Sequence, residues 1–325
     1  RWPARTRACR VPASGGAVGA RWAAGVTRAR AMAAGRAGAE AARRMADGPA
    51  LEDSLRALAG TPYRRDLDVR AEAGAAARAV TASLVWQLRV LAGWQPRPGA
   101  AAVRLLASRF EIDNTRDHLR ALDGTPQPPP LRLGALSTAW PRLSRATSAA
   151  QVRAVLAASV WGDPGGEGAA AVLTGMRLSA AARTAANVPS AARWAAGEAA
   201  LLVAREVFVS GRVPTPAASV HASRLLGRAA VHASDYDGFR RRLPSAARWA
   251  LASADRPEEL WRAEARWWTQ VERDGLRLLH GAGLDPSPVV GATAVLSADA
   301  WRVRAALECA AHGGRAREAF DELLD

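Results

Sequence analysis

Apolar residues recur along this chain at the spacing of an α-helix. Leu51, Leu55 and Leu58 stand four and three positions apart, and later positions repeat such intervals. The later sets are Leu84, Leu88 and Leu91; Val103, Leu106 and Phe110; and Trp194, Leu201 and Phe208. Intervals of three, four and seven place side chains on one stripe of a helix, which then faces a core. Because no strand-like alternation lasts more than a few residues, the pattern predicts an all-α fold.

Helix-breaking residues divide these helices into groups. Gly60, Thr61 and Pro62 end the helix that begins at Leu51, because Gly suits the end of a helix and Pro cannot continue one. The segment 124–131 contains four prolines and predicts a stiff, extended connector. We predict the following organisation: a tail at 1–18, then helical lobes at 19–125, 126–243 and 244–325.

Two kinds of element repeat along the chain. Short amphipathic helices are predicted to begin near Leu51, near Ser148 and near Arg256, each after polar residues that suit a helix start. A second element runs from Phe110 to Arg116 and recurs at 299–304. Arg116 and Arg304 are separated by the same number of positions as Leu119 and Leu307. Repeated elements in a fixed order indicate duplicated lobes.

The chain is strongly basic. It has 45 basic residues, all of them Arg, against 30 acidic ones, for a net charge of +15. The residues 1–49 hold about half of this excess, and we expect the residues 1–18 to form a disordered basic tail. Such a charge fits nucleic-acid binding. It also fits a genome that favours Arg over Lys, and this second interpretation is preferred because most Arg residues alternate with Glu or Asp on helix faces.

Motifs for catalysis or metal binding are missing from the sequence. The nearest approach to a metal site is His118 with Asp113 and Asp117, a spacing more typical of an ordinary helical His. Without Lys there is no P-loop, and no nucleophile elbow or paired-Cys motif is present. We therefore predict no catalytic, cofactor-binding or metal-binding residues. Only two cysteines, Cys9 and Cys309, and no membrane-length apolar run favour a cytoplasmic protein.

Three tryptophans form the densest aromatic patch. Trp267 stands seven positions after Leu260 and is predicted to belong to a core stripe. Trp261 and Trp268 are candidates for a subunit interface, because Trp is enriched where proteins bind one another.

The repeated elements resemble the C subunit, also called d, of V-type and A-type rotary ATPases. The resemblance covers the chain from about residue 19 to its end. The middle lobe lacks the Thr-Pro-Tyr motif, and Arg302 stands where that family usually has Asn. The residues that carry the resemblance are Thr61, Pro62, Tyr63, Phe110, Asp113, Asn114, Arg116, Arg120, Pro288, Asp299 and Arg304.

The resemblance implies a fold and a function. It implies three related helical lobes in a pseudo-threefold, funnel-like arrangement. It also implies a non-catalytic rotor subunit, without cofactor, that joins the proteolipid ring of the membrane sector to the central-stalk subunits. Such a subunit couples ATP hydrolysis to ion transport, lies peripherally on the cytoplasmic face of the membrane, and needs no nucleic acid. Two alternatives stay open: an Arg-rich helical nucleic-acid-binding protein, and a helical scaffold of this fold detached from any ATPase.

The motif residues are expected to specify the fold. Asp113 and Asn114 are short polar residues before an apolar helical run and suit the capping of backbone N–H groups. Asp113 and Arg116, three positions apart, suit an ion pair, and Asp113 and Asp117 are also expected to pair with Arg120. The ring of Tyr63 is expected to pack under its lobe, with the hydroxyl bonded to backbone.

Overall fold

The computed structural model describes residues 14–312, and every regular element in that range is a helix. The predicted all-α fold is thus confirmed. Of the predicted tail, residues 1–13 lie outside the described range, whereas residues 14–18 belong to the first helix. Within the described residues, none of the helices combines the length and apolarity required to cross a membrane.

The α-helices vary from one turn to seven turns in length and are joined by 3-10 and π segments. In chain order the elements are α1 (Ser14–Ala34), α2 (Gly38–Ala46), α3 (Leu51–Ala59), η1 (Pro62–Arg64), α4 (Ala73–Gly93), α5 (Arg97–Leu106), α6 (Ser108–Leu122), η2 (Gly134–Leu136), α7 (Trp140–Leu143), α8 (Ala149–Ala157), α9 (Ala169–Asn187), η3 (Pro189–Ala191), α10 (Ala192–Ala204), the π segment η4 (Arg205–Val209), α11 (Pro216–Leu226), α12 (Arg228–Val231), α13 (Tyr236–Arg242), α14 (Ser245–Arg248), η5 (Trp249–Leu251), η6 (Pro257–Glu259), α15 (Leu260–His280) and α16 (Ser287–His312).

Local hydrogen bonds account for the predicted end of α3 and for the predicted start of α8. The Thr61 hydroxyl donates to the Leu58 carbonyl at 2.7 Å, and its oxygen accepts from the Tyr63 N–H at 3.2 Å, so Thr61 closes α3 and opens η1. Ser148 caps α8 by accepting from the Gln151 N–H at 3.2 Å. Near Arg256, in contrast, the short element is the 3-10 turn η6, which leads directly into the long helix α15.

Three clusters of buried apolar side chains form the interior. The first joins α1–α5 to α16, the second joins α9–α15 to α16, and the third lies among α6–α9. The first cluster therefore combines both ends of the described chain. The boundaries between the predicted lobes and their pseudo-threefold relation stay predictions.

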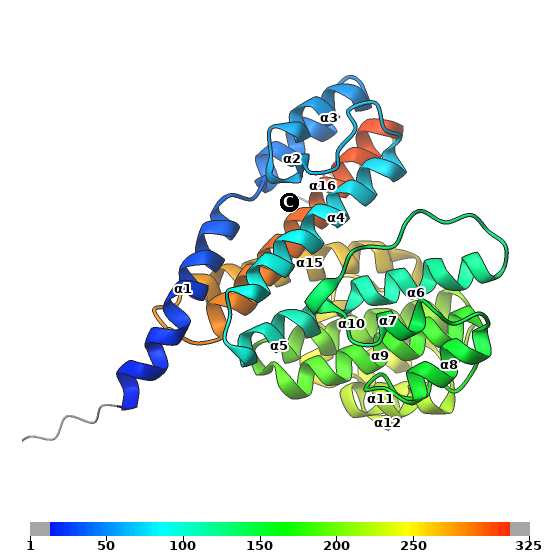
Figure 1. Cartoon of the computed structure of the whole chain (residues 1–325). Coiled ribbons are helices and arrows are strands. Elements are labelled where there is room, and N and C mark those ends of the chain that lie inside the picture. The colour runs from blue at the N-terminus through cyan, green and yellow to red at the C-terminus, as the bar shows by residue number, and fades with distance from the viewer. Residues whose placement is uncertain (1–13, 313–325) are drawn as a thin grey trace, which may run out of the picture.

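Helix α16 connects the first two clusters. Every residue from 288 to 300 is buried, with Val289 and Val295 in the first cluster and Val290 and Ala294 in the second. A helix that is apolar on all sides must be covered on all sides. Figure 1 shows α16 beside α4, with α2 and α3 near the upper end of this pair and the block that contains α6–α12 below.

Two glycines allow α15 and α16 to lie in contact through their backbones. A Cβ placed on Gly291 would stand 2.4 Å from the Gly275 carbonyl oxygen and 2.8 Å from the Leu279 nitrogen. Only glycine at this position permits such an approach, since both obstacles are backbone atoms.

Candidate functional site

Asp299, a residue of the resemblance motif, bonds segments from opposite ends of the chain. Its carboxylate accepts from the N–H groups of Ala37, at 3.0 Å, and Gly38, at 2.7 Å. It also accepts from the Tyr63 hydroxyl at 2.9 Å. Asp299 is fully buried and thereby caps α2 while holding the turn after α3. These four residues are called the Asp299 lock.

The expectation for Tyr63 was half right. Its ring is buried, as predicted, but its hydroxyl donates to the Asp299 carboxylate and not to backbone. Burial, and then the charge of Asp299, raise the pKa of Tyr63. Burial also raises the pKa of Asp299, against the hydrogen bonds from Gly38, Tyr63 and Ala37, which lower it.

Glu111 makes an equivalent set of bonds in the middle of the chain. Its carboxylate accepts from the N–H groups of Thr138 and Ala139, the latter at 2.7 Å, and from the Trp161 indole N–H at 2.9 Å. Ala139 immediately precedes α7, and Trp161 follows α8, so the carboxylate again caps one short helix and holds the turn after the next. These four residues are called the Glu111 lock.

The two locks occupy corresponding places in the repeat. Glu111 precedes Arg116 by the same number of residues as Asp299 precedes Arg304. Each carboxylate lies on a long helix, caps a short one and binds an aromatic donor that follows a second short helix. The two segments that the sequence analysis compared therefore make equivalent contacts, while the duplication of whole lobes stays a prediction. Glu111 was not singled out among the candidate residues, although it stands inside the motif.

The residues between the acids and the arginines serve other contacts. Asn114 accepts from the Leu131 N–H at 2.8 Å and donates to the Leu131 carbonyl at 2.9 Å, which fixes the end of the proline-rich connector. Arg302, at the corresponding position, is paired with Glu272 of α15. The prediction that Asp113 and Asn114 cap a helix was wrong, because α6 begins at Ser108 and both residues lie inside it.

The predicted ion pair between Asp113 and Arg116 is confirmed at 2.7 Å. Asp117 pairs with Arg78 at 3.1 Å and with Arg116 at 3.2 Å instead of with Arg120, which is exposed. Burial lowers the pKa of Arg304, and the next cause is the nearby Arg109. The remaining motif residues have packing roles: Pro62 starts η1, while Phe110 and Pro288 are buried.

The tryptophans of α15 differ in exposure. Trp261 is 40% exposed, with the Arg262 guanidinium over its ring. Trp267 is buried in the second cluster, as predicted. Trp268 is buried too, between the guanidinium of Arg109, 5.2 Å from its ring centre, and the stacked ring of Trp301. The Trp261 side chain is thus partly accessible to a partner protein, whereas the Trp268 ring is covered by contacts within the chain.

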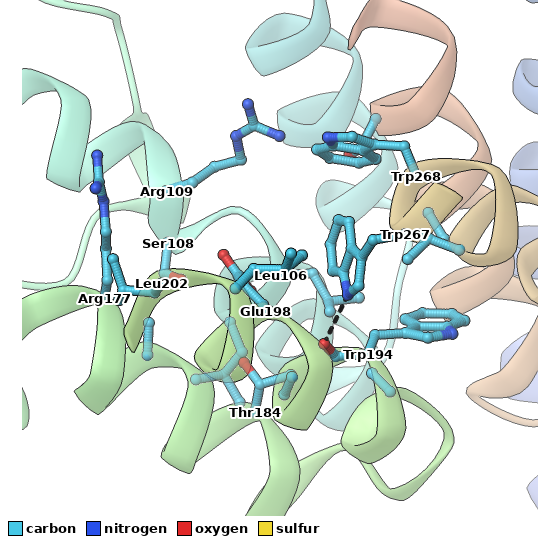
Figure 2. Close-up of a pocket in the computed structure, with 18 of the residues that line it drawn as sticks. Leu106, Ser108, Arg109, Arg177, Thr184, Trp194, Glu198, Leu202, Trp267 and Trp268 are labelled. Carbon is cyan, nitrogen blue, oxygen red and sulfur yellow. Dashed lines mark hydrogen bonds between the residues drawn. The ribbon is translucent and has the colours of Figure 1, made fainter. Parts of the chain in front are cut away.

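A recess of about 280 Å³ opens where helices of all three predicted lobes meet. Its walls come from α5 and α6, from α9 and α10, and from α15 and α16. Figure 2 shows the rings of Trp194, Trp267 and Trp268 on one side and Glu198 directed into the open space. The Trp267 indole donates to the Trp194 carbonyl at 3.0 Å, which fixes the ring in the wall.

The charged groups of the recess are only partly paired. Arg205 binds Glu264 at 2.6 Å. Within residues 14–312, Arg109, Arg177 and Glu198 have no hydrogen bond or ion pair with an oppositely charged side chain. The Glu198 side chain faces the open recess, while the surrounding protein desolvates it and raises its pKa; Arg109 and Arg177 oppose that rise.

The recess escaped the sequence analysis. Arg109, Arg177 and Glu198 lie on three different helices, α6, α9 and α10, and each resembles an ordinary polar face position. The one available signal was in α10, where Glu198 is the sole acid in an otherwise Ala- and Leu-rich helix.

No metal centre is formed by the described residues. Across 14–312, no group of three or more His, Cys, Asp or Glu side chains is placed to hold a metal ion. His118 contacts the Ala146 carbonyl at 2.9 Å and packs edge-on against Trp140. Cys309 is buried on α16, and Cys9 lies outside the described range.

Comparison with known proteins gives no family assignment. No protein-family model matches the chain, and no curated protein matches it.

Proposed function

We propose that this protein is a non-catalytic rotor subunit of a V-type or A-type rotary ATPase. In this role it joins the proteolipid ring to the central-stalk subunits, on the cytoplasmic face of the membrane, and transmits torque between them. The proposal rests on the resemblance of the motif residues to the C, or d, subunit. The observation that carries it is that two of these motif segments, far apart in the chain, build equivalent locks around Asp299 and Glu111.

Torque transmission requires packed, rigid connections rather than chemistry. Each lock fastens short helices to a long one through a buried carboxylate with three donors, and truncating either carboxylate would strand those donors. Helix α16 in turn is packed into two clusters at once. A body built this way resists shear between its segments, as a coupling element must.

The stalk is proposed to bear on the concave surface that the resemblance implies, and not in the recess. An α-helix with its side chains is about 10–12 Å across, too wide for a space of about 280 Å³. Trp261 with its neighbouring Arg262 is an exposed aromatic group suited to a subunit contact.

Many Arg residues are already paired with acids, which weakens the nucleic-acid alternative. Arg153 binds Asp163 at 2.9 Å, Arg212 binds Glu206 at 2.9 Å and Arg240 binds Asp255 at 2.8 Å. Such guanidiniums are less available to phosphate than free ones. A nucleic-acid-binding protein would instead show affinity that falls steeply with salt.

Purification through a tag on the chain, from detergent-solubilised membranes of its own host, tests the proposal. We expect a small proteolipid and two large nucleotide-binding subunits to co-purify and to be identified by mass spectrometry. An untagged strain gives the background, and a Trp261→Ala variant should reduce the yield of one partner class. Recovery of the wild-type chain alone would contradict the proposal and leave the detached scaffold as the better interpretation.

A further inference from the structure

We propose that the recess binds a small organic monoanion, a carboxylate or sulfonate carried on an aromatic or short aliphatic group. The inference does not rest on the proposed function, because it is argued only from the charges, walls and size of the recess.

The charge of the recess sets the charge of the ligand. Arg205 is balanced by Glu264, and Asp113 is balanced by Arg116. Arg109 and Arg177 then face a single carboxylate, Glu198, which leaves one positive charge over. An unbalanced positive charge on the part-buried Arg109 and Arg177 attracts an anion, which accepts charge-assisted hydrogen bonds from a guanidinium.

The walls select an apolar group beside the charge. Trp267, Leu106 and Leu202 line an apolar side, as Figure 2 shows, and Trp268 lies behind Arg109 in the same wall. The Arg109 guanidinium therefore borders this apolar side, where the carboxylate of a bound ligand would reach it. Ligand sites commonly combine an apolar lining with a few converging polar groups.

Size and charge exclude other classes of ligand. A volume of about 280 Å³ is at the lower end for ligand sites and suits a single ring or a short chain. A nucleotide or polyphosphate would be too large, and its further charges would be repelled by Glu198. An organic cation would have one acid to bind and two free guanidiniums to repel it.

Three probes of matched shape test the charge requirement with the full chain. They are 3-phenylpropionate, its neutral amide 3-phenylpropionamide and the cationic 3-phenylpropylamine, each titrated by calorimetry. We expect the carboxylate to bind, the amide to bind at least about tenfold more weakly, since it lacks the charge-assisted hydrogen bond, and the amine not to bind. Equal binding of all three, or no binding of the carboxylate at millimolar concentration, would overturn the inference.

Substitutions locate the binding. Arg177→Gln should weaken carboxylate binding by about tenfold or more, whereas Arg145→Gln, an exposed Arg outside the recess, should leave it unchanged. Glu198→Gln should tighten binding, because it removes the like charge. Thermal unfolding of each variant shows whether the fold is retained. Equal effects of Arg177→Gln and Arg145→Gln, or weaker binding in Glu198→Gln, would place the ligand elsewhere.

Acid should act like the Glu198→Gln substitution. The groups around Glu198 are Arg109 from α6, Arg177 from α9, and Glu264 from α15 with its partner Arg205. Because the pKa of Glu198 is raised, its negative charge is lost by protonation at a higher pH than that of an ordinary Glu would be. Binding of 2-phenylethanesulfonate, which stays ionised, should tighten with falling pH in the wild type. A slope of the same size in Glu198→Gln would contradict this assignment.

Discussion

The Asp299 lock and the Glu111 lock use the same chemistry over different chain distances. In the first, Asp299 reaches partners 262, 261 and 236 positions away, and in the second, Glu111 reaches partners 27, 28 and 50 positions away. The Asp299 lock therefore joins segments near the two ends of the described chain. The Glu111 lock closes a local segment.

This difference teaches which contact the whole fold depends on. Losing the Asp299 lock frees α2 and the turn after α3 from α16, which lies in two of the three core clusters. Losing the Glu111 lock frees α7 and the turn after α8, whose buried residues belong to the third cluster alone. Segments with few buried contacts open locally at lower free energy than the core does.

Removal of Asp299 should have the largest effect. Asp299→Ala leaves the buried Tyr63 hydroxyl and the part-buried N–H groups of Ala37 and Gly38 without their acceptor. We expect a loss of about 3–5 kcal/mol in the free energy of unfolding, measured by urea denaturation. Asp123→Ala, at the exposed end of α6, serves as control and should change stability by less than about 0.5 kcal/mol. A loss as small as that of the control in Asp299→Ala would show that the hydrogen bonds of Asp299 do not stabilise the fold.

Removal of Glu111 should cost less and act locally. Glu111→Ala strands the N–H groups of Thr138 and Ala139 and the Trp161 indole, but these donors belong to one local segment that can open without the rest of the fold. We expect a loss of about 2–3 kcal/mol. Limited proteolysis should cut within 124–165 in this variant and not in Asp299→Ala. Cleavage at the same sites in both would contradict the distinction.

A smaller change isolates a single bond of the Asp299 lock. Tyr63→Phe keeps the ring in its buried place and removes only the hydroxyl that donates to Asp299. A hydrogen bond to a charged group contributes about 1.5–3 kcal/mol, and we expect a loss toward the lower end, because two N–H donors remain. An unchanged unfolding midpoint would mean that the hydroxyl does not hold the turn.

The smallest effect concerns pH. Burial raises the pKa of Asp299 in the folded protein above its unfolded value of 3.8. Between these two pKa values the folded form holds a proton that the unfolded form has lost, so stability from this group is full at lower pH and declines as the pH rises through the folded pKa. The stability of the wild type minus that of Asp299→Asn should therefore fall from about pH 4 toward neutrality. A difference in stability that rises with pH would show that folding lowers the pKa of Asp299.

The helices were predictable because their apolar stripes are local properties. Leu55 and Leu58 are buried on the face of α3 that the spacing of Leu51, Leu55 and Leu58 indicated. The repeat was visible for the same reason, since Glu111 and Asp299 hold corresponding positions before an Arg and a Leu.

The partners of the two carboxylates were not predictable. Ala37, Gly38 and Ala139 contribute backbone N–H groups, and no side-chain pattern marks a backbone donor. The helix start before Asp113 was misjudged because α6 follows α5 after a single residue, Ala107, which carries no breaking signal. The recess needs three helices to be placed before its charges meet.

Hydrogen exchange of the backbone amides, compared between Asp299→Asn and Glu111→Gln, tests the equivalence of the two locks most directly. Each variant keeps the size of its side chain and loses one acceptor. We predict faster exchange at Ala37 and Gly38 and along α2 in the first, and at Thr138 and Ala139 and along α7 in the second, with each variant leaving the other lock protected. Unchanged protection at these amides, or loss of protection at both places in either variant, would contradict two equivalent and separate locks.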